Sequence, residues 1–254
     1  WLTPLPFPVQ VLEKVETIDH ISGNKHVSTY RYHHGYYDGR ERAFMGFGRV
    51  DQFDTETFAD FARPDLHGED SPFGNASPAH HMPPVETRTW YHTGVYFDSL
   101  GARRVDYRDL AQRFRQEFYA LDTLAPPLPP HMVETGDAPA EAYRALRGAP
   151  LRSEIYAHDG SERAVHPYQV SETRHRVKQL QPRGGNAHAV FLVDQAEGLS
   201  YSYERNPADP RITHTLTLAL DAYGNPLRTL SIGYGRRQAD ADLPRQDQQE
   251  QRPG

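Results

Sequence analysis

The chain has 254 residues, a formal net charge of −6, no cysteine, and 11% aromatic residues with Tyr and Phe predominant. This length can bury a substantial core, and the aromatic content favours strands over a leucine-rich helical bundle. The acidic balance argues against nucleic-acid binding, the missing cysteines exclude disulfides and thiolate metal sites, and no apolar run reaches the roughly 18 residues of a membrane span.

Residues 1–62 are predicted to form a β segment of strand–turn–strand units. Short apolar or alternating runs at 9–11, 15–18 and 27–32 indicate strands, and Asp38-Gly39 predicts a tight hairpin turn. A return strand is expected over 44–50, where glycines inside the strand indicate bulges. The chain opens on Trp1 rather than methionine, so we expect it to be an internal fragment of a longer protein.

Residues 63–150 are predicted to hold a loop, a strand and a two-helix insertion. The loop covers 63–84, which is rich in proline, and the strand covers 86–97. The apolar spacing of 106–121 predicts a helix that begins after Asp106. A shorter helix is predicted over 138–147, with Asp137 as its N-cap and Gly148 just beyond its end.

Residues 151–235 are predicted to form a β-sheet segment, and 236–254 a polar linker. The stretch 212–220 has the clearest alternation in the chain. A weak internal repeat places Asp, a short gap and Gly-Asn at both 19–24 and 221–225, each between two strand-like runs. This pattern is typical of a hairpin in which Asp and Asn bind local backbone groups and Gly takes the left-handed conformation.

The 14 histidines are candidate metal ligands, but their spacing argues against a metal site. His33-His34 with His26, and His80-His81 with His92, are the obvious groups. Adjacent histidines on a strand point to opposite faces, so each pair supplies one ligand at most. Because HExxH and comparable helical spacings are missing, we predict no metal site and no cofactor.

Catalytic and ligand-binding motifs are equally weak. The chain has no GxSxG around Ser153 or Ser171, and its glycine pairs (46 and 48, 184 and 185) lack a phosphate-binding pattern. Carboxylate pairs such as Glu154 and Asp159 occur by chance in a chain with 34 acidic residues. The aromatic residues between 30 and 47 favour cross-strand packing over a sugar platform. We therefore predict no catalytic residue and no enzyme activity.

Several stretches together resemble the middle and C-terminal region of the TcdB/TcaC-like insecticide toxin proteins, which are the B components of Tc toxin complexes. The family is related to SpvB-like virulence proteins and to Rhs/YD-repeat proteins. The matching stretches are 30–50, 90–94, 151–160, 179–191, 201–212 and 221–237. Their order and spacing carry the resemblance, which extends over residues 3–245.

The resemblance implies a mainly β fold: a curved antiparallel sheet of Rhs-like strand–turn–strand units with a short helical insertion, continuing through 236–254 toward Rhs repeats. It implies a structural role in a hollow β shell that encloses a toxic effector in a secreted, extracellular complex. The partners would be an Rhs-repeat C component carrying the effector and a pore-forming A component, which docks through a propeller outside this chain. No nucleic-acid partner and no membrane insertion by this segment are expected.

Two other classes of protein remain open from the residues alone. One is a free-standing β-sandwich hydrolase, carbohydrate-active or metal-dependent, which would bring carboxylates or histidines together in one pocket. The other is a carbohydrate-binding or adhesion module, for which a large exposed aromatic patch would be the sign.

Overall fold

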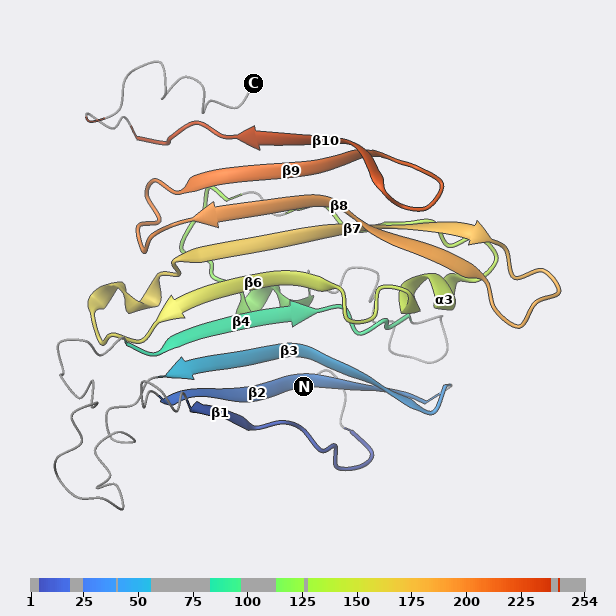
Figure 1. The fold of residues 1–254 in the computed structure, drawn as a ribbon, viewed down its shortest axis with the longest axis horizontal. Coiled ribbons are helices and arrows are strands. Elements are labelled where there is room, and N and C mark those ends of the chain that lie inside the picture. The colour runs from blue at the N-terminus through green and yellow to red at the C-terminus, as the bar shows by residue number, and fades with distance from the viewer. Residues whose placement is uncertain are drawn as a thin grey trace.

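The computed structural model describes residues 5–18, 25–39, 41–55, 83–96, 113–125, 128–238 and 242. Within them, ten strands form one twisted and curved sheet (Figure 1). The strands are β1 (Lys14–Ile18), β2 (Lys25–Asp38), β3 (Ala43–Thr55), β4 (Val85–Tyr91), β5 (Met132–Val133), β6 (Pro150–Ala157), β7 (Gln169–Gln181), β8 (Val190–Ser202), β9 (Arg211–Leu220) and β10 (Pro226–Gly233). The helical elements are η2 (Arg115–Glu117), α3 (Pro139–Arg144) and η3 (Glu162–Val165).

The sheet is an antiparallel meander, which confirms the predicted fold class. Its order is β1-β2-β3-β4-β6-β7-β8-β9-β10, so neighbours along the chain are also neighbours in the sheet. The exception is β5, which pairs with β7 in parallel, Met132 opposite Arg176. The long β2–β3 and β7–β8 hairpins have register shifts. Such bulges bend the strands, as a curved sheet requires.

The two faces of the sheet differ because side chains alternate along each strand. In the central strands, Trp90, Arg152 and Glu172 occupy one row. Their face is covered by residues 113–125 and 128–131, which we call the strap, and we call the covered face the strapped face. The pattern of buried residues follows this alternation: Trp90 and Glu154 are fully buried, whereas their strand neighbours on the other face are partly exposed.

The core consists of three clusters between the sheet and the insertion that follows β4. In the first, Phe114 of the strap packs against Trp90 and Leu151. In the second, Leu146, just beyond α3, packs against Val177 of β7. The third surrounds Val170, Leu199, Tyr201 and Tyr203, with Tyr119 and Leu128 of the strap against it. The insertion therefore supplies the apolar cover that a single sheet needs to bury one face.

The insertion departs from the sequence prediction at its helix ends. Helical structure at 113–117 ends at Glu117, and Phe118 is extended, so the prediction of helix to 121 is wrong; its start at Asp106 lies outside the described residues. α3 confirms the second helix, but its N-cap is Ala138. Asp137 instead accepts hydrogen bonds from Gln179 and from the backbone of the β7–β8 turn. Tertiary contacts thus use the carboxylate that local capping would have used.

Two strand predictions are also wrong in their bounds or existence. Residues 9–11 are not a strand, and β4 ends at Tyr91 rather than 97. Beyond Tyr91 the backbone stays bonded to the residues just before β6, with the His92 N–H on the Ala149 carbonyl, until Gly94 leaves the extended conformation with a φ of +74°. The bulge expected from the glycines of 44–50 is confirmed at Gly46, which lies at a register shift with a φ of +106°.

The second copy of the predicted repeat is a hairpin turn between β9 and β10. The Asp221 carboxylate accepts hydrogen bonds from the backbone N–H groups of Tyr223 and Asn225 and from the Asn225 side chain. Gly224 has the left-handed φ of +89°. The predicted chemistry of this turn is confirmed; the first copy, at 19–24, lies outside the described residues.

At Gly48 of β3, Phe114 of the strap lies close to the backbone. A Cβ atom there would lie 2.8 Å from Cζ of Phe114 and 3.1 Å from Cβ of His34. Gly48→Ala is therefore expected to push Phe114 out of its cluster and lower the free energy of unfolding by about 1–3 kcal/mol. Chemical denaturation measures the loss. Gly39→Ala is the control, since its Cβ meets nothing within 4 Å, and equal losses for both variants would contradict the explanation.

Among the described residues, no helix is both long and apolar enough to cross a bilayer.

Candidate functional site

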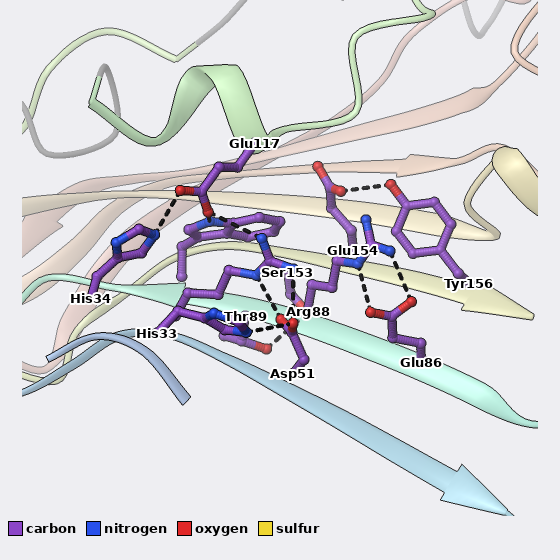
Figure 2. Close-up of polar contacts among 12 residues, drawn as sticks. His33, His34, Asp51, Glu86, Arg88, Thr89, Glu117, Ser153, Glu154 and Tyr156 are labelled. Atoms are coloured by element: carbon purple, nitrogen blue, oxygen red, sulfur yellow. Dashed lines mark hydrogen bonds and ion pairs between the residues drawn. The ribbon is translucent and has the colours of Figure 1, made fainter. Parts of the chain in front are cut away.

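Charged side chains of opposite sign lie next to one another on the strapped face (Figure 2). Arg49 of β3 binds both oxygens of Asp51, at 2.6 and 2.8 Å. On β4, Arg88 binds both oxygens of Glu86, at 2.8 and 2.9 Å. These pairs lie two residues apart on one strand, so both members point to the same face. Bidentate contacts of this kind fix the orientation of both side chains.

Glu117 of η2 ties the strap to the sheet. Its carboxylate accepts hydrogen bonds from His34 Nε2 at 2.6 Å, Arg49 Nη1 at 3.1 Å and Trp90 Nε1 at 3.2 Å. Figure 2 shows this carboxylate pointing from the strap toward side chains of β2, β3 and β4. Burial raises the pKa of Glu117, but the three hydrogen bonds outweigh it and hold the pKa at about 2. Glu117 is therefore charged in the folded protein and holds three strands to one point.

Glu117→Gln is expected to loosen the strap and to lower the free energy of unfolding by about 1–3 kcal/mol, because Arg49 and His34 lose their shared anion. The native contribution is present above the ordinary carboxyl pKa of 4.5 and is lost as the pH falls toward 2. Limited proteolysis of the strap and denaturation at pH 7 measure the effect. Gln116→Ala, at an exposed neighbour, is the control; a matching loss in this control would contradict the assignment.

A second network is deeper in the sheet, around the fully buried Glu154 of β6. Arg152 donates to Glu154 Oε1 at 2.6 Å and also binds Glu172 of β7. Glu154 accepts two further hydrogen bonds, from the Tyr119 N–H of the strap at 2.9 Å and from the Tyr156 hydroxyl at 2.7 Å. Burial, and next to it the nearby charge of Glu154, raises the pKa of Tyr156, so this hydroxyl stays protonated and donates. The network is closed: each buried charge has a partner.

A cavity of about 310 Å³ lies between the strap and β6, β7 and β8. Its lining includes Tyr119, Asp122, Arg152, Glu172 and Tyr203. The polar members bind one another or nearby groups: Asp122 accepts from the Tyr203 hydroxyl at 2.8 Å and from the Arg237 guanidinium at 2.9 Å. Burial and this charge raise the pKa of Tyr203. The cavity is a gap under the strap whose named charges already have partners.

Three histidines gather where β4, the strap and β7 meet. The ring centroids of His92 and His131 are 5.9 Å apart, and those of His131 and His175 are 5.4 Å apart. Burial, followed by the neighbouring histidines, lowers the pKa of His92 to about 3; burial, His175 and Arg174 lower the pKa of His131 to about 4. Both rings are therefore neutral at physiological pH.

The tautomers of these histidines argue against metal binding. His92 Nδ1 accepts the Gly94 N–H at 2.9 Å, and His131 Nδ1 accepts the His175 N–H at 3.1 Å. A neutral imidazole that accepts at Nδ1 carries its proton on Nε2, so neither ring has a free lone pair for a metal. No group of three or more potential ligands in the described part of the chain is arranged to hold a metal ion.

The other histidines considered from the sequence have separate partners. His33 binds Asp51 at 3.0 Å, His34 binds Glu117, and His26 lies 3.6 Å from Asp54. The structure does not bring these three to one point. His80 and His81 lie outside the described residues.

The carboxylates and serines considered for catalysis are also separated. Glu154 is in the buried network, whereas Asp159 lies in the turn after β6 and binds Arg205. The hydrogen bonds that the Asp159 carboxylate accepts, first from Arg205 and then from Ser161, lower its pKa. Ser153 and Ser171 lie on the opposite face of the sheet, where Ser153 contacts Thr89 and Ser171 contacts Gln169. These positions form neither a carboxylate pair nor a nucleophile with its base.

The glycine pairs do not form phosphate loops. Gly46 and Gly48 lie inside β3. In the β7–β8 turn, the backbone N–H groups of Arg183 and Gly184 already bind the Asp137 carboxylate. Among the aromatic residues, Phe47 of β3 packs across the ladder against Tyr32 of β2, with ring centroids 4.8 Å apart, and along its own strand against Phe44, at 5.1 Å. The contact with Tyr32 is the cross-strand packing that the sequence favoured over a sugar platform.

Two family models match parts of the chain. The family model described as the insecticide toxin TcdB middle/N-terminal region matches residues 1–62, and the model of the TcdB middle/C-terminal region matches residues 141–253. No curated protein sequence matches the chain.

Solved structures of toxin complexes share both sequence and fold with the chain. The crystal structure of TcdB2-TccC3 without its hypervariable C-terminal region is 32% identical, with a TM-score of 0.73 over 94% of this chain and 10% of that chain. A TcdB2-TccC3-Cdc42 crystal structure is 33% identical, with a TM-score of 0.72 over 95% and 11%. The Photorhabdus luminescens Tc holotoxin pore with a TccC3 mutation is 32% identical, with a TM-score of 0.73 over 93% and 10%. The chain thus spans about a tenth of the length of these relatives.

Proposed function

Because the chain belongs to the TcdB family of insecticide toxin proteins, we propose that it is a structural segment of a Tc toxin B component. In this role it forms part of the wall of a hollow β shell that encloses a toxic effector. The observation that carries the proposal is the open sheet itself: ten strands cover a wide area, while one face alone is packed by the strap. Among the described strands, β1 and β10 are the edges of the sheet, and each edge has a row of backbone groups that further strands of the parent protein would pair with.

The partners of the assembly follow from the relatives. We propose that the parent protein closes its shell with an Rhs-repeat C component that carries the effector, and that residues 236–254 lead toward that repeat region. A pore-forming A component would dock through a propeller outside this chain, and the complex would act outside the bacterial cell. Support comes from the relatives, in which TcdB2 is paired with TccC3 and a related chain is part of a holotoxin pore.

We propose further that this segment performs no catalysis. A hydrolase needs an acid, base or nucleophile that is free to act on substrate. The named carboxylates of the strapped face are instead held in ion pairs, with Glu86, Asp51 and Glu154 all bound by arginines. Carboxylates held in this way stabilise the fold and are not free to act on a substrate.

Protease protection of the effector tests the shell role. In the complete B component assembled with its C partner, the effector is expected to resist an added protease that degrades it when the C component is expressed alone. Leu199→Arg places a charge in the buried third cluster of the wall and is expected to make the effector cleavable. Leu218→Arg, at a half-exposed position of β9, is the matched control and should leave the effector protected. Equal resistance with the C component alone would refute a role of this wall in enclosure.

A further inference from the structure

The face of the sheet opposite the strap has an unusual composition. One cross-strand row runs from β4 to β9 through Thr89, Ser153, Ser171, Ser200 and Thr213, each directly opposite the next in the ladder. Every member is a small side chain with one hydroxyl group. The strands, which are neighbours through backbone pairing, therefore present a continuous line of hydroxyls across the sheet.

A neighbouring row repeats this chemistry at three of its four positions. Thr173, Gly198, Thr215 and Ser231 form a second row across β7 to β10. The hydroxyls bond sideways or to the backbone: Thr89 lies 3.4 Å from Ser153, and Thr215 donates to the Gly198 carbonyl at 3.2 Å. We call the surface formed by these two rows the hydroxyl face. Its members on β4, β6, β7 and β8 are partly exposed, and Thr213, Thr215 and Ser231 are exposed.

The charges of the same strands lie on the strapped face. On the hydroxyl-face side, the alternating positions of β4 and β6, of β7 from 169 to 173 and of β8 from 198 to 202 hold no Asp, Glu, Lys or Arg. On the strapped side of these segments, Glu86, Arg88, Arg152, Glu154 and Glu172 carry charge. Charged residues, which make up 24% of the chain, are thus missing from this side of these four strand segments; the nearest in the ladder are Asp54 of β3, opposite Val85, and Arg211 of β9, opposite Ser202.

This composition fits neither a docking face nor an ordinary outer surface. Two sheets pack face to face through apolar side chains, and a Ser/Thr row has little apolar area to bury. The outer surface of a soluble protein carries Lys, Arg, Glu and Asp interspersed, which keep it soluble. A neutral hydroxyl surface instead has no fixed charge to bind a passenger of either sign and no apolar patch to hold its hydrophobic residues.

We propose that the hydroxyl face lines the inside of the shell and is the surface that an unfolded polypeptide passenger touches. The inference rests on the proposed function. It adds the orientation of the wall, with the hydroxyl face inward, and the reason why this face binds the passenger only weakly. Its hydroxyls exchange hydrogen bonds with backbone amides of any sequence, while the charged side chains are paired beneath the strap. Weak contacts of this kind suit relatives in which one TcdB2-TccC3 pair is combined with Cdc42 and another with TEV.

Photo-crosslinking in the complete B–C complex tests the orientation. The crosslinking residue p-benzoyl-L-phenylalanine is placed either at Ser171 on the hydroxyl face or at Ala120, an exposed position of the strap. Irradiation is expected to join position 171 to the effector. At position 120, effector adducts should not exceed background. Protease protection of the effector is measured on the same samples, so that closure of the shell is known independently.

The outcomes separate the two proposals. Effector adducts at 120 and none at 171, with the effector protected, would reverse the orientation and overturn this inference while leaving the shell role intact. A protected effector with no adducts at either position would overturn the contact with the hydroxyl face. An effector that is cleaved in both complexes, although the unmodified complex protects it, would show that the inserted residue opens the wall. A smaller diazirine-bearing residue, inserted at the same two positions, then decides the orientation. An effector that is cleaved in the unmodified complex would instead refute the proposed function.

Discussion

Arg152→Met is expected to lower the free energy of unfolding by about 3–5 kcal/mol, because it leaves a buried carboxylate without its cation. Glu154 is fully buried, and Arg152 is its one cationic partner among the contacts described above. Methionine fills much of the same space with an unbranched side chain but loses the guanidinium, whose carbon lies 4.7 Å from the Phe118 ring centroid. The loss measured by chemical denaturation therefore reports the charge rather than a cavity.

A double variant makes this prediction specific. Adding Glu154→Gln to Arg152→Met removes the unpaired charge while keeping an oxygen to accept the Tyr119 N–H, so part of the lost stability should return. Arg211→Met breaks a pair in which both side chains are about 60% exposed, and it should change stability by about 0.5 kcal/mol or less. If the double variant is less stable than Arg152→Met alone, the unpaired charge is not the cause.

Acidification from pH 7 to pH 5 is expected to remove roughly 2 kcal/mol of stability for each of His92 and His131. Their pKa values in the folded protein are about 3 and 4, below the ordinary 6.5. Between pH 6.5 and about 4 the unfolded chain therefore binds protons that the folded chain refuses, so stability falls as the pH falls. Above pH 6.5 both states are neutral at these positions and the contribution is constant.

The double variant His92→Asn, His131→Asn tests this assignment. The asparagine Oδ1 takes the place of Nδ1 as acceptor for the Gly94 and His175 N–H groups, but it cannot be protonated. Denaturation at pH 7, 6 and 5 should show a flatter pH dependence than in the original protein. His188→Asn, at a side chain that is 75% exposed, should leave the slope unchanged. An unaltered slope in the double variant would assign the acid sensitivity to other groups.

The strands were predictable because their signals are local. The alternation over 212–220 and the turn residues at 221–225 are enough to define β9, β10 and the hairpin between them, and each prediction was confirmed within a residue or two. Asp38-Gly39 marked the position of the β2–β3 hairpin, although its last pair is Asp38 with Ala43 and the left-handed residue described in the turn is Arg42 rather than Gly39. In these elements, neighbouring residues supply both the conformation and the partner.

The strap was not predictable, because its contacts join residues far apart in the chain. Glu117 binds Arg49 and His34, which precede it by 68 and 83 positions, and nothing around Glu117 in the sequence indicates these partners. Asp137 has the spacing of an N-cap, yet its partners lie more than 40 positions later. The separation of charged and hydroxyl side chains between the two faces did leave a pattern in the sequence. Ser and Thr alternate with apolar or charged residues in several strands, and the ladder register places the two sets on opposite faces.

The meander order of the sheet also decides how the wall can be built during synthesis. Except at β5, each strand pairs with one that has already left the ribosome, so the wall can lengthen hairpin by hairpin with short loop closures. In the described part of the chain, the cover of Trp90 of β4, with Tyr36 of β2 beside it, is Phe114 of the strap, which emerges after these strands. The stretch of translation between β4 and β6 is therefore the interval in which the growing chain most needs a chaperone, and slow codons there would prolong it.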